Sequence, residues 1–306
     1  MEIYLPVAQV SINWVILLGM GLGVGFLSGM LGVSGGFIMT PLLIFYGIPP
    51  GVSVATQASP IAAASLAGAI TKGGRRSVDY KMGVALMAGG LVGSLLGVDL
   101  FQYLQRLGQV DIVVEASYVL LLGSVGGLML NESLRALLAA RKGASLPVHK
   151  PGQHTWIHNL PFKMRFRQSG LYISVIPVVV LGFGVGILTA ILGTGGAFLL
   201  IPAKIYLLRM RTDIAVGTSQ FQMFAVAIMT TLMHALTDKT VDIILALILI
   251  TGGVVGAQLG TRAGSRLRGE QLRLFFAALT LLIAVDLLYG LVHTPADVYS
   301  TVMGLQ

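Results

Sequence analysis

The chain has 306 residues, of which 55% are hydrophobic and 10% charged, and its mean hydropathy is +0.87. A soluble domain carries about 25% charged residues, so the composition excludes an ordinary soluble protein and indicates one that lies in a lipid bilayer. Cysteine is absent, which excludes disulfides, thiolate catalysis and cysteine-based metal sites. Basic loops that orient a membrane protein account for the net charge of +8, and we expect no nucleic-acid partner.

Apolar segments separated by glycine, proline or charged residues follow one another along the chain. Five precede a polar, basic linker at 135–170 and five follow it, at 12–32, 35–47, 52–70, 82–103, 112–134, 171–192, 197–208, 214–236, 242–260 and 273–292. No basic region precedes the first segment, so we interpret it as a retained helix and not as a cleaved signal. The pattern predicts an all-α polytopic membrane protein with a first transmembrane repeat at 12–134 and a second at 171–292.

The two halves share one sequence pattern. Gly23–Pro41, GVGFLSGMLGVSGGFIMTP, recurs 161 residues later as Gly184–Pro202, GVGILTAILGTGGAFLLIP, with nine of the nineteen positions identical. Both copies then continue with a Val-Asp pair and a Gly-Gly-x-x-Gly-x-x-x-Gly pattern. Two copies of a glycine-broken apolar unit in one membrane chain are typical of secondary transporters, whose substrate site lies between the copies.

The second segment of each copy is short. Segments 35–47 and 197–208 are well below the roughly 20 apolar residues that a helical span needs. Each follows a glycine-rich break and contains a proline, Pro41 or Pro202. We predict that both are half-helices, and two such breaks at corresponding positions favour a transporter with a site near the membrane midplane.

Two acidic residues and two glycine patterns have structural interpretations. Asp79 and Asp242 each stand where a helix follows a loop, so we expect them to be N-caps. The glycine patterns that begin at Gly89 and Gly252 place small residues at spacings of three and four, which lets membrane helices approach closely. A phosphate-binding loop would need a preceding strand and a charged partner, and the sequence offers neither.

The basic residues predict the orientation of the chain. If all ten segments cross with the N-terminus outside, 17 of the 20 lysines and arginines fall in the inner loops 71–81, 135–170, 209–213 and 261–273. The positive-inside rule then places both termini outside the cytoplasm of a plasma (inner) membrane. Five crossings per copy is an odd number, so we expect the repeats to be inverted.

The duplicated G-V-G-x-L-x-x-x-L-G-x-x-G block, followed by Val54-Ala-Thr-Gln57 or Val216-Gly-Thr-Ser219, resembles the sulfite exporter TauE/SafE family, also called the toluene sulfonate uptake permease family. The resemblance covers residues 14–292 and both repeats. It implies an integral membrane protein that moves small sulfur-containing anions such as sulfite, thiosulfate, sulfoacetate or other organosulfonates, and we expect export. Lys204, directly after Pro202, is less typical of the apolar stretch and marks a departure from the family pattern.

The two glycine breaks are the first candidate anion-binding groups. The first break is Ser34-Gly35-Gly36 and the second is Thr194-Gly195-Gly196, and each immediately precedes a half-helix. Backbone N–H groups and the partial positive charge of a helix N-terminus suit an oxyanion, and each break adds a hydroxyl. The alternative is that these glycines only let the helices break and pack.

A second polar cluster follows each half-helix, and it comprises Gln57 and Ser59 in the first copy and Gln220 and Gln222 in the second. Hydroxyls and amides near the start of a membrane helix often serve as caps or as hydrogen bonds between helices. Inverted symmetry would instead bring both clusters to the midplane, where they would complete the binding shell. Both roles stay open.

Charged groups inside the segments are few. Lys204 either snorkels to the inner membrane boundary or attracts the anion, and Asp286 in the last segment is protonated, paired, or carries a coupled proton. Since the first copy has no lysine that matches Lys204, we expect neutral dipoles to contribute more to recognition than formal charge. The histidines of the linker, His149, His154 and His158, lack accompanying acidic residues, so we expect solvated loop, no metal and no cofactor.

Two other classes of protein compete with a transporter. An intramembrane enzyme would need a Ser/His pair or clustered metal ligands within the segments, and His234 is the one histidine there. A non-transporting scaffold does not explain two matching broken helices. We therefore expect a transporter and no enzyme, with a small anion and the lipid bilayer as its partners. The identity of the anion, the coupling ion and a homo-oligomeric state stay open.

Overall fold

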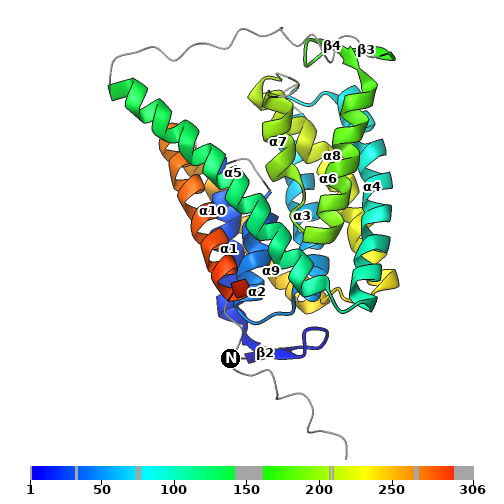
Figure 1. The fold of residues 1–306 in the computed structure, drawn as a ribbon, viewed down its shortest axis with the longest axis vertical. Coiled ribbons are helices and arrows are strands. Elements are labelled where there is room, and N and C mark those ends of the chain that lie inside the picture. The colour runs from blue at the N-terminus through cyan, green and yellow to red at the C-terminus, as the bar shows by residue number, and fades with distance from the viewer. Residues whose placement is uncertain are drawn as a thin grey trace, which may run out of the picture. The chain divides into compact units, whose positions relative to one another are not determined.

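The structure, a computed structural model, describes residues 2–31, 34–73, 77–141, 161–206, 208, 210–264 and 269–292. These residues form ten helices and two short β-hairpins (Figure 1). In chain order the elements are β1 (Glu2–Leu5), β2 (Val10–Asn13), α1 (Trp14–Leu31), α2 (Gly36–Phe45), α3 (Pro50–Gly73), α4 (Tyr80–Arg106), α5 (Val110–Arg141), β3 (Lys163–Phe166), β4 (Leu171–Ser174), α6 (Val175–Leu192), α7 (Ala197–Tyr206), α8 (Thr212–Thr237), α9 (Ile243–Gly264) and α10 (Gly269–Val292). The linker histidines lie outside the described residues.

Each of the ten predicted segments is a helix, so the predicted helical polytopic fold is confirmed. Among the described residues, five helices contain a stretch long and apolar enough to cross a membrane: α4, α5, α6, α8 and α9. Helices α2 and α7 have ten residues each, which corresponds to about 15 Å of helix, half of the roughly 30 Å hydrocarbon core. The predicted half-helices are therefore present. The inverted orientation of the two copies stays a prediction.

The chain divides into two compact units. The first contains residues 1–110 and 147–267, and therefore α1–α4 and α6–α9. The second contains residues 111–146 and 268–306, in which α5 packs on α10 near Gly126 and Leu281. The first unit thus holds the first four helices of each predicted repeat, and it contains both glycine breaks.

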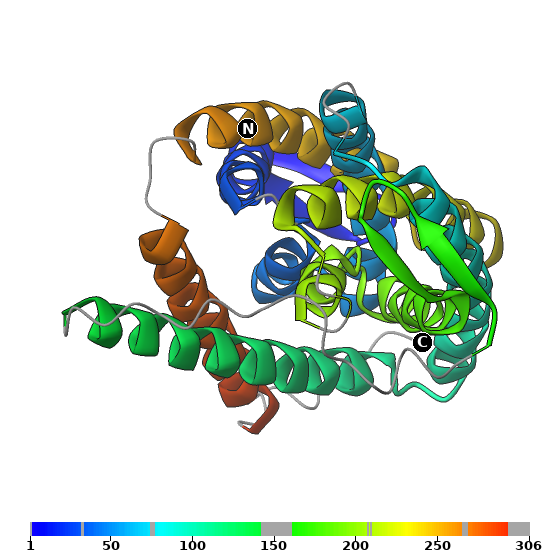
Figure 2. The same ribbon diagram turned by 90° about the horizontal axis from the view of Figure 1, so that it is seen from above.

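Within the first unit, helices of one copy pack on helices of the other. Helix α1 lies along α9, α4 lies along α6, and α3 lies along α8 (Figures 1 and 2). Glycines make the first two contacts close: a Cβ on Gly25 would lie 2.8 Å from the Cα of Gly253, and a Cβ on Gly186 would lie 2.9 Å from the carbonyl carbon of Gly90. The interpretation of the glycine patterns as packing surfaces is confirmed.

Asp79 and Asp242 are N-caps, as predicted. Asp79 accepts a hydrogen bond from the Met82 N–H (3.3 Å), and Asp242 accepts from the Leu245 N–H (3.1 Å). The second carboxylate oxygen of each residue has a further partner that the sequence did not predict. Asp79 accepts from the backbone and hydroxyl of Ser169, and Asp242 accepts from the backbone of Val7. Each aspartate thereby holds the turn of the hairpin that precedes the other copy.

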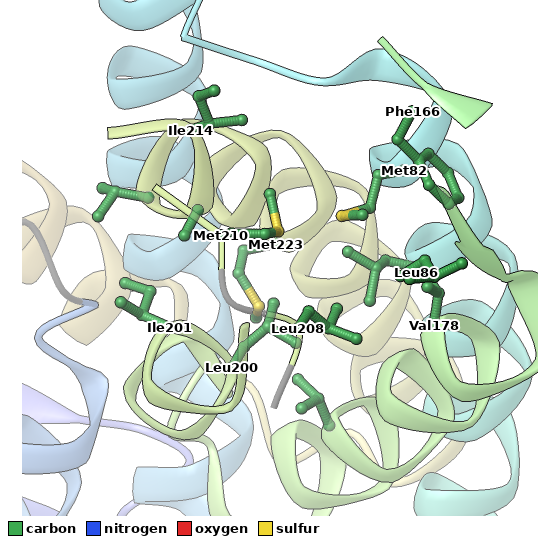
Figure 3. Close-up of a cluster of buried hydrophobic side chains, with 14 residues drawn as sticks. Met82, Leu86, Phe166, Val178, Leu200, Ile201, Leu208, Met210, Ile214 and Met223 are labelled. Carbon is green, nitrogen blue, oxygen red and sulfur yellow. The ribbon is translucent and has the colours of Figure 1, made fainter. Parts of the chain in front are cut away.

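The two hairpins are short and antiparallel, with Glu2 opposite Asn13 in the first and Lys163 opposite Ser174 in the second. The sequence predicted neither hairpin: β2 overlaps the start of the predicted segment 12–32, and β4 lies inside the predicted segment 171–192, where its apolar residues continue into the helix. A cluster of buried apolar side chains, called the apolar cluster below, fills the space between α4, α6, α7, α8 and the second hairpin (Figure 3). Its members include Leu86, Val185, Leu200 and Met223.

Candidate functional site

The two glycine breaks contact each other. A Cβ added to Gly36 would lie 2.8 Å from the carbonyl oxygen of Gly193 and 2.9 Å from that of Thr194, and a Cβ added to Gly195 would lie 2.7 Å from Ser34 Oγ. Gly195 also has a φ of +70°, which L side chains rarely adopt. Only glycine therefore allows the two backbones this close approach, and the structure brings together the two regions that the sequence singled out.

The hydroxyl of each break has the same local role. The Gly36 N–H donates to Ser34 Oγ (3.5 Å), and the Gly196 N–H donates to Thr194 Oγ1 (3.3 Å). Just after the breaks, Phe37 and Phe198 stack with their ring centroids 4.5 Å apart. These aromatic residues occupy equivalent positions in the two copies, so the half-helices α2 and α7 meet at their N-termini.

A small cavity lies at the first break. Its volume is about 40 Å³, whereas one water needs roughly 10–15 Å³. Its lining comes from α1, the first break, α2, α3 and α9, and consists of Gly21, Val24, Gly25, Ser28, Ser34, Gly35, Gly36, Met39, Gln57, Pro60, Ile61, Ala64, Leu249, Gly253 and Ala257. Four predicted site residues, Ser34, Gly35, Gly36 and Gln57, thus share one cavity.

The amide of Gln57 is the main polar side chain of α3 at this cavity. Its exposed fraction is 4%, and its Oε1 has no hydrogen-bond partner. A buried amide oxygen without a partner costs free energy, so it marks a place for a polar ligand. A rotation of 180° about the last side-chain bond would present the donating Nε2 at the same place. Ser59 is half-buried on α3 and does not line the cavity.

The second copy places its predicted residues differently. Gln222 is fully buried on α8, and neither its Oε1 nor its Nε2 has a partner. Gln220 instead packs against α3, where its Cδ would lie 3.0 Å from a Cβ added to Gly68. Neither Gln222 nor Gln220 lines the cavity at the first break.

Lys204 and Asp286 have opposite environments. Lys204 on α7 is fully buried, and its Nζ donates to Ser219 Oγ (2.9 Å). It does not reach the surface, as a snorkelling lysine would. Asp286 lies on α10 in the other unit, and its side chain is exposed. Lys204 therefore lies in the unit that holds the two breaks, whereas Asp286 lies in the other unit.

The sequence did not predict the buried pair of His234 and Asp238 at the end of α8, nor the contact of His234 with α6. His234 Nδ1 lies 2.8 Å from a carboxylate oxygen of Asp238, and its Nε2 lies 3.1 Å from the carbonyl oxygen of Ala190. Both ring nitrogens thus face acceptors. The spacing of four residues between His234 and Asp238 on one helix could have indicated the pair. The contact to Ala190 holds α8 near the end of α6, just before the second break.

Two half-helices whose N-terminal breaks touch beside a small cavity, within a bundle that contains helices long and apolar enough to cross a membrane, are typical of a membrane transporter. The comparison with protein families makes this specific: the chain belongs to the sulfite exporter TauE/SafE family, whose sequence model matches residues 17–287. No solved structure matches the chain.

Curated bacterial relatives are similar to the chain over nearly their whole length. A probable membrane transporter protein of Xylella fastidiosa (strain 9a5c) is 27% identical over 90% of this chain and 95% of its own. The probable membrane transporter proteins YunE and YjnA of Bacillus subtilis (strain 168) are 24% and 26% identical, over 90% and 88% of this chain and 98% and 97% of their own. These names agree with the class that the fold and the cavity define.

Proposed function

We propose that the protein is a secondary transporter that exports small sulfur-containing anions, such as sulfite, thiosulfate or organosulfonates, and binds them where the two glycine breaks meet. The observation that carries this proposal is the cavity at the first break, with the unpartnered amide of Gln57. The N-terminus of α2 adds backbone N–H groups and a partial positive charge. The family name supports sulfite as the first anion to test.

The size of the cavity favours the smaller anions of this class. Its room of about 40 Å³ suits a group of a few heavy atoms, such as sulfite or thiosulfate. An organosulfonate carries a carbon chain as well, so the lining would have to move apart. A neutral shell of amide, hydroxyl and backbone donors would hold such an anion yet release it readily, as turnover requires.

We further propose that the two copies are inverted repeats, with both termini outside the cytoplasm of the inner membrane. Equivalent residues make equivalent contacts across the copies: the Asp242 N–H donates to Thr56 Oγ1, and the Asp79 N–H donates to Thr218 Oγ1, each at 3.0 Å. This two-fold pattern supports a pseudo-two-fold axis. The charges of the hairpins support the orientation, because β3 carries Lys163 and Arg165 whereas β1 carries Glu2.

The test of the substrate class is a flux assay with the purified protein in proteoliposomes. The panel is sulfite, thiosulfate, sulfoacetate, sulfate and chloride. We expect sulfite and thiosulfate to move faster than sulfoacetate, and chloride to move more slowly than any of the three. If chloride moved and none of the sulfur anions did, the proposed substrate class would be wrong, although the protein would still be a transporter.

A further inference from the structure

Lys204 is a fully buried lysine beside the apolar cluster. The side chains three and four residues before it on α7, Ile201 and Leu200, and Leu208 four residues after it, all belong to the apolar cluster (Figure 3). Among the residues that the structure describes, the recorded acceptor for its Nζ is Ser219 Oγ, whose own hydroxyl donates to the carbonyl of Ala215. An ammonium group has three donors, so two of them have no acceptor among the described residues.

A buried ammonium group without a counter-charge is costly. Its removal from water costs several kcal/mol, which one neutral hydroxyl does not offset. No ion pair of Lys204 with a carboxylate is present among the described residues, in contrast to His234, which has Asp238. An anion is the group that would satisfy both the charge and the remaining donors.

The position of Lys204 corresponds to the cavity of the first copy. Four apolar residues that line that cavity, Val24, Met39, Ile61 and Leu249, align in the repeat with Val185, Leu200, Met223 and Leu86. All four counterparts belong to the apolar cluster. The counterpart of the first cavity is therefore the place that the apolar cluster fills.

The polar lining of the first cavity also has counterparts. Gln57 aligns with Ser219, the partner of Lys204, and Pro60 aligns with Gln222, whose buried amide has no partner. Lys204 itself aligns with Leu43. The second copy thus gathers an ammonium group, a hydroxyl and a free amide where the first copy has one amide.

We infer that Lys204, Ser219 and Gln222 form a second oxyanion subsite, which opens when the apolar cluster parts during transport. The inference rests on the proposed function, in which the repeats move against each other and exchange conformations. In this conformation the first cavity is open and its counterpart is packed. In the alternate conformation the counterpart opens, and the anion meets a fixed positive charge there.

This subsite modifies the expectation that the sequence raised. The lining of the first cavity contains no charged side chain, whereas the second copy adds a lysine at the matching position. Charge-assisted hydrogen bonds are roughly twice as strong as neutral ones. Lys204 would therefore make the largest single contribution to affinity for an oxyanion in the second copy.

The experiment measures binding of sulfite to the purified full-length protein by the rise of its unfolding temperature with sulfite concentration. Gluconate at equal ionic strength is the reference salt. The variant is Lys204→Met, which removes the amino group and leaves an unbranched side chain one heavy atom shorter. Lys204→Gln is the second variant should the first fail to fold. The matched control is Lys81→Met, which removes an exposed lysine from α4.

We expect Lys204→Met to weaken the apparent affinity for sulfite by about tenfold or more, the size of effect that follows from loss of one charge-assisted contact. In gluconate, it should be at least as stable as the wild type, because methionine fills the site without a buried charge. Lys81→Met should bind as the wild type does. An unchanged affinity in Lys204→Met, or a wild type that binds none of sulfite, thiosulfate and sulfate, would overturn the subsite.

The proposed function fails in a different way. In that event the wild-type protein moves none of the sulfur anions in proteoliposomes, whatever Lys204 does. Flux in the wild type together with unchanged binding in Lys204→Met would remove the subsite alone and leave the cavity at the first break as the transport site.

Discussion

Gln57 lines the cavity at the first break, and its buried amide oxygen has no hydrogen-bond partner. We predict that Gln57→Leu loses most of the flux of sulfite in proteoliposomes, because leucine has a similar size but can neither donate nor accept a hydrogen bond. The matched control is Ser59→Ala, which changes a half-buried polar residue on the same helix outside the cavity. Equal losses in both variants would point to damage of α3 and not to loss of an anion contact.

Thr56 and Thr218 test the contacts between the copies. The hydroxyl of Thr56 accepts from the buried N–H of Asp242, so Thr56→Val leaves that donor without a partner. An unsatisfied buried donor costs about 1–3 kcal/mol, and we predict a destabilisation of this size in thermal or denaturant unfolding in detergent. Thr218→Val should cost a similar amount at Asp79. Thr251→Val, at an exposed position of α9, is the control and should be near neutral.

Local sequence signals predicted the local contacts of these residues and no more. Asp79 and Asp242 were predicted as caps because a cap needs only the residues that follow it. Their contacts to Ser169 and Val7 join residues 90 and 235 positions apart, and nothing in the local pattern indicates them. Lys204 is similar: its burial depends on Ser219, on another helix, whereas the sequence shows only a lysine in an apolar stretch.

At the scale of elements, the half-helices depend on glycine at the point where the breaks touch. We predict that Gly36→Ala removes most of the flux, because its Cβ would clash with the carbonyl oxygens of Gly193 and Thr194 and push the breaks apart. Gly23→Ala in α1 is the matched control, since nothing lies within 4 Å of a Cβ there. The amount of each variant in the membrane fraction, and the yield of purified protein, should be similar. Full flux in Gly36→Ala would show that transport does not depend on the close contact between the breaks.

The elements themselves were predictable because their signals are continuous runs of residues. Ten apolar segments, two short ones after glycines and two glycine patterns all correspond to features of the structure. The partners of each helix were not predictable. Lipid-facing and protein-facing sides of a membrane helix are both apolar, so hydrophobic periodicity does not tell which side meets which helix. The pairing of α1 with α9 and of α4 with α6 needed the structure.

At the scale of the whole molecule, the orientation in the membrane follows from the two hairpins. We predict that Tyr4→Cys in β1 is labelled by an impermeant thiol reagent in intact cells, whereas Lys163→Cys in β3 is labelled only after the membrane is opened. Both side chains are exposed, and the chain has no native cysteine to interfere. The reason is the excess of basic residues near β3. The reverse labelling pattern would invert the proposed topology, and labelling of both positions from one side would contradict the inverted repeats.

The central claim is that a sulfur oxyanion crosses the membrane through the place where the two breaks meet. The most direct measurement is the efflux of radiolabelled sulfite from proteoliposomes that contain the wild-type protein, Gly36→Ala or no protein. We predict rapid efflux with the wild type and near-background efflux with Gly36→Ala. Wild-type efflux no faster than that of protein-free liposomes, or efflux unaffected by Gly36→Ala, would contradict the claim.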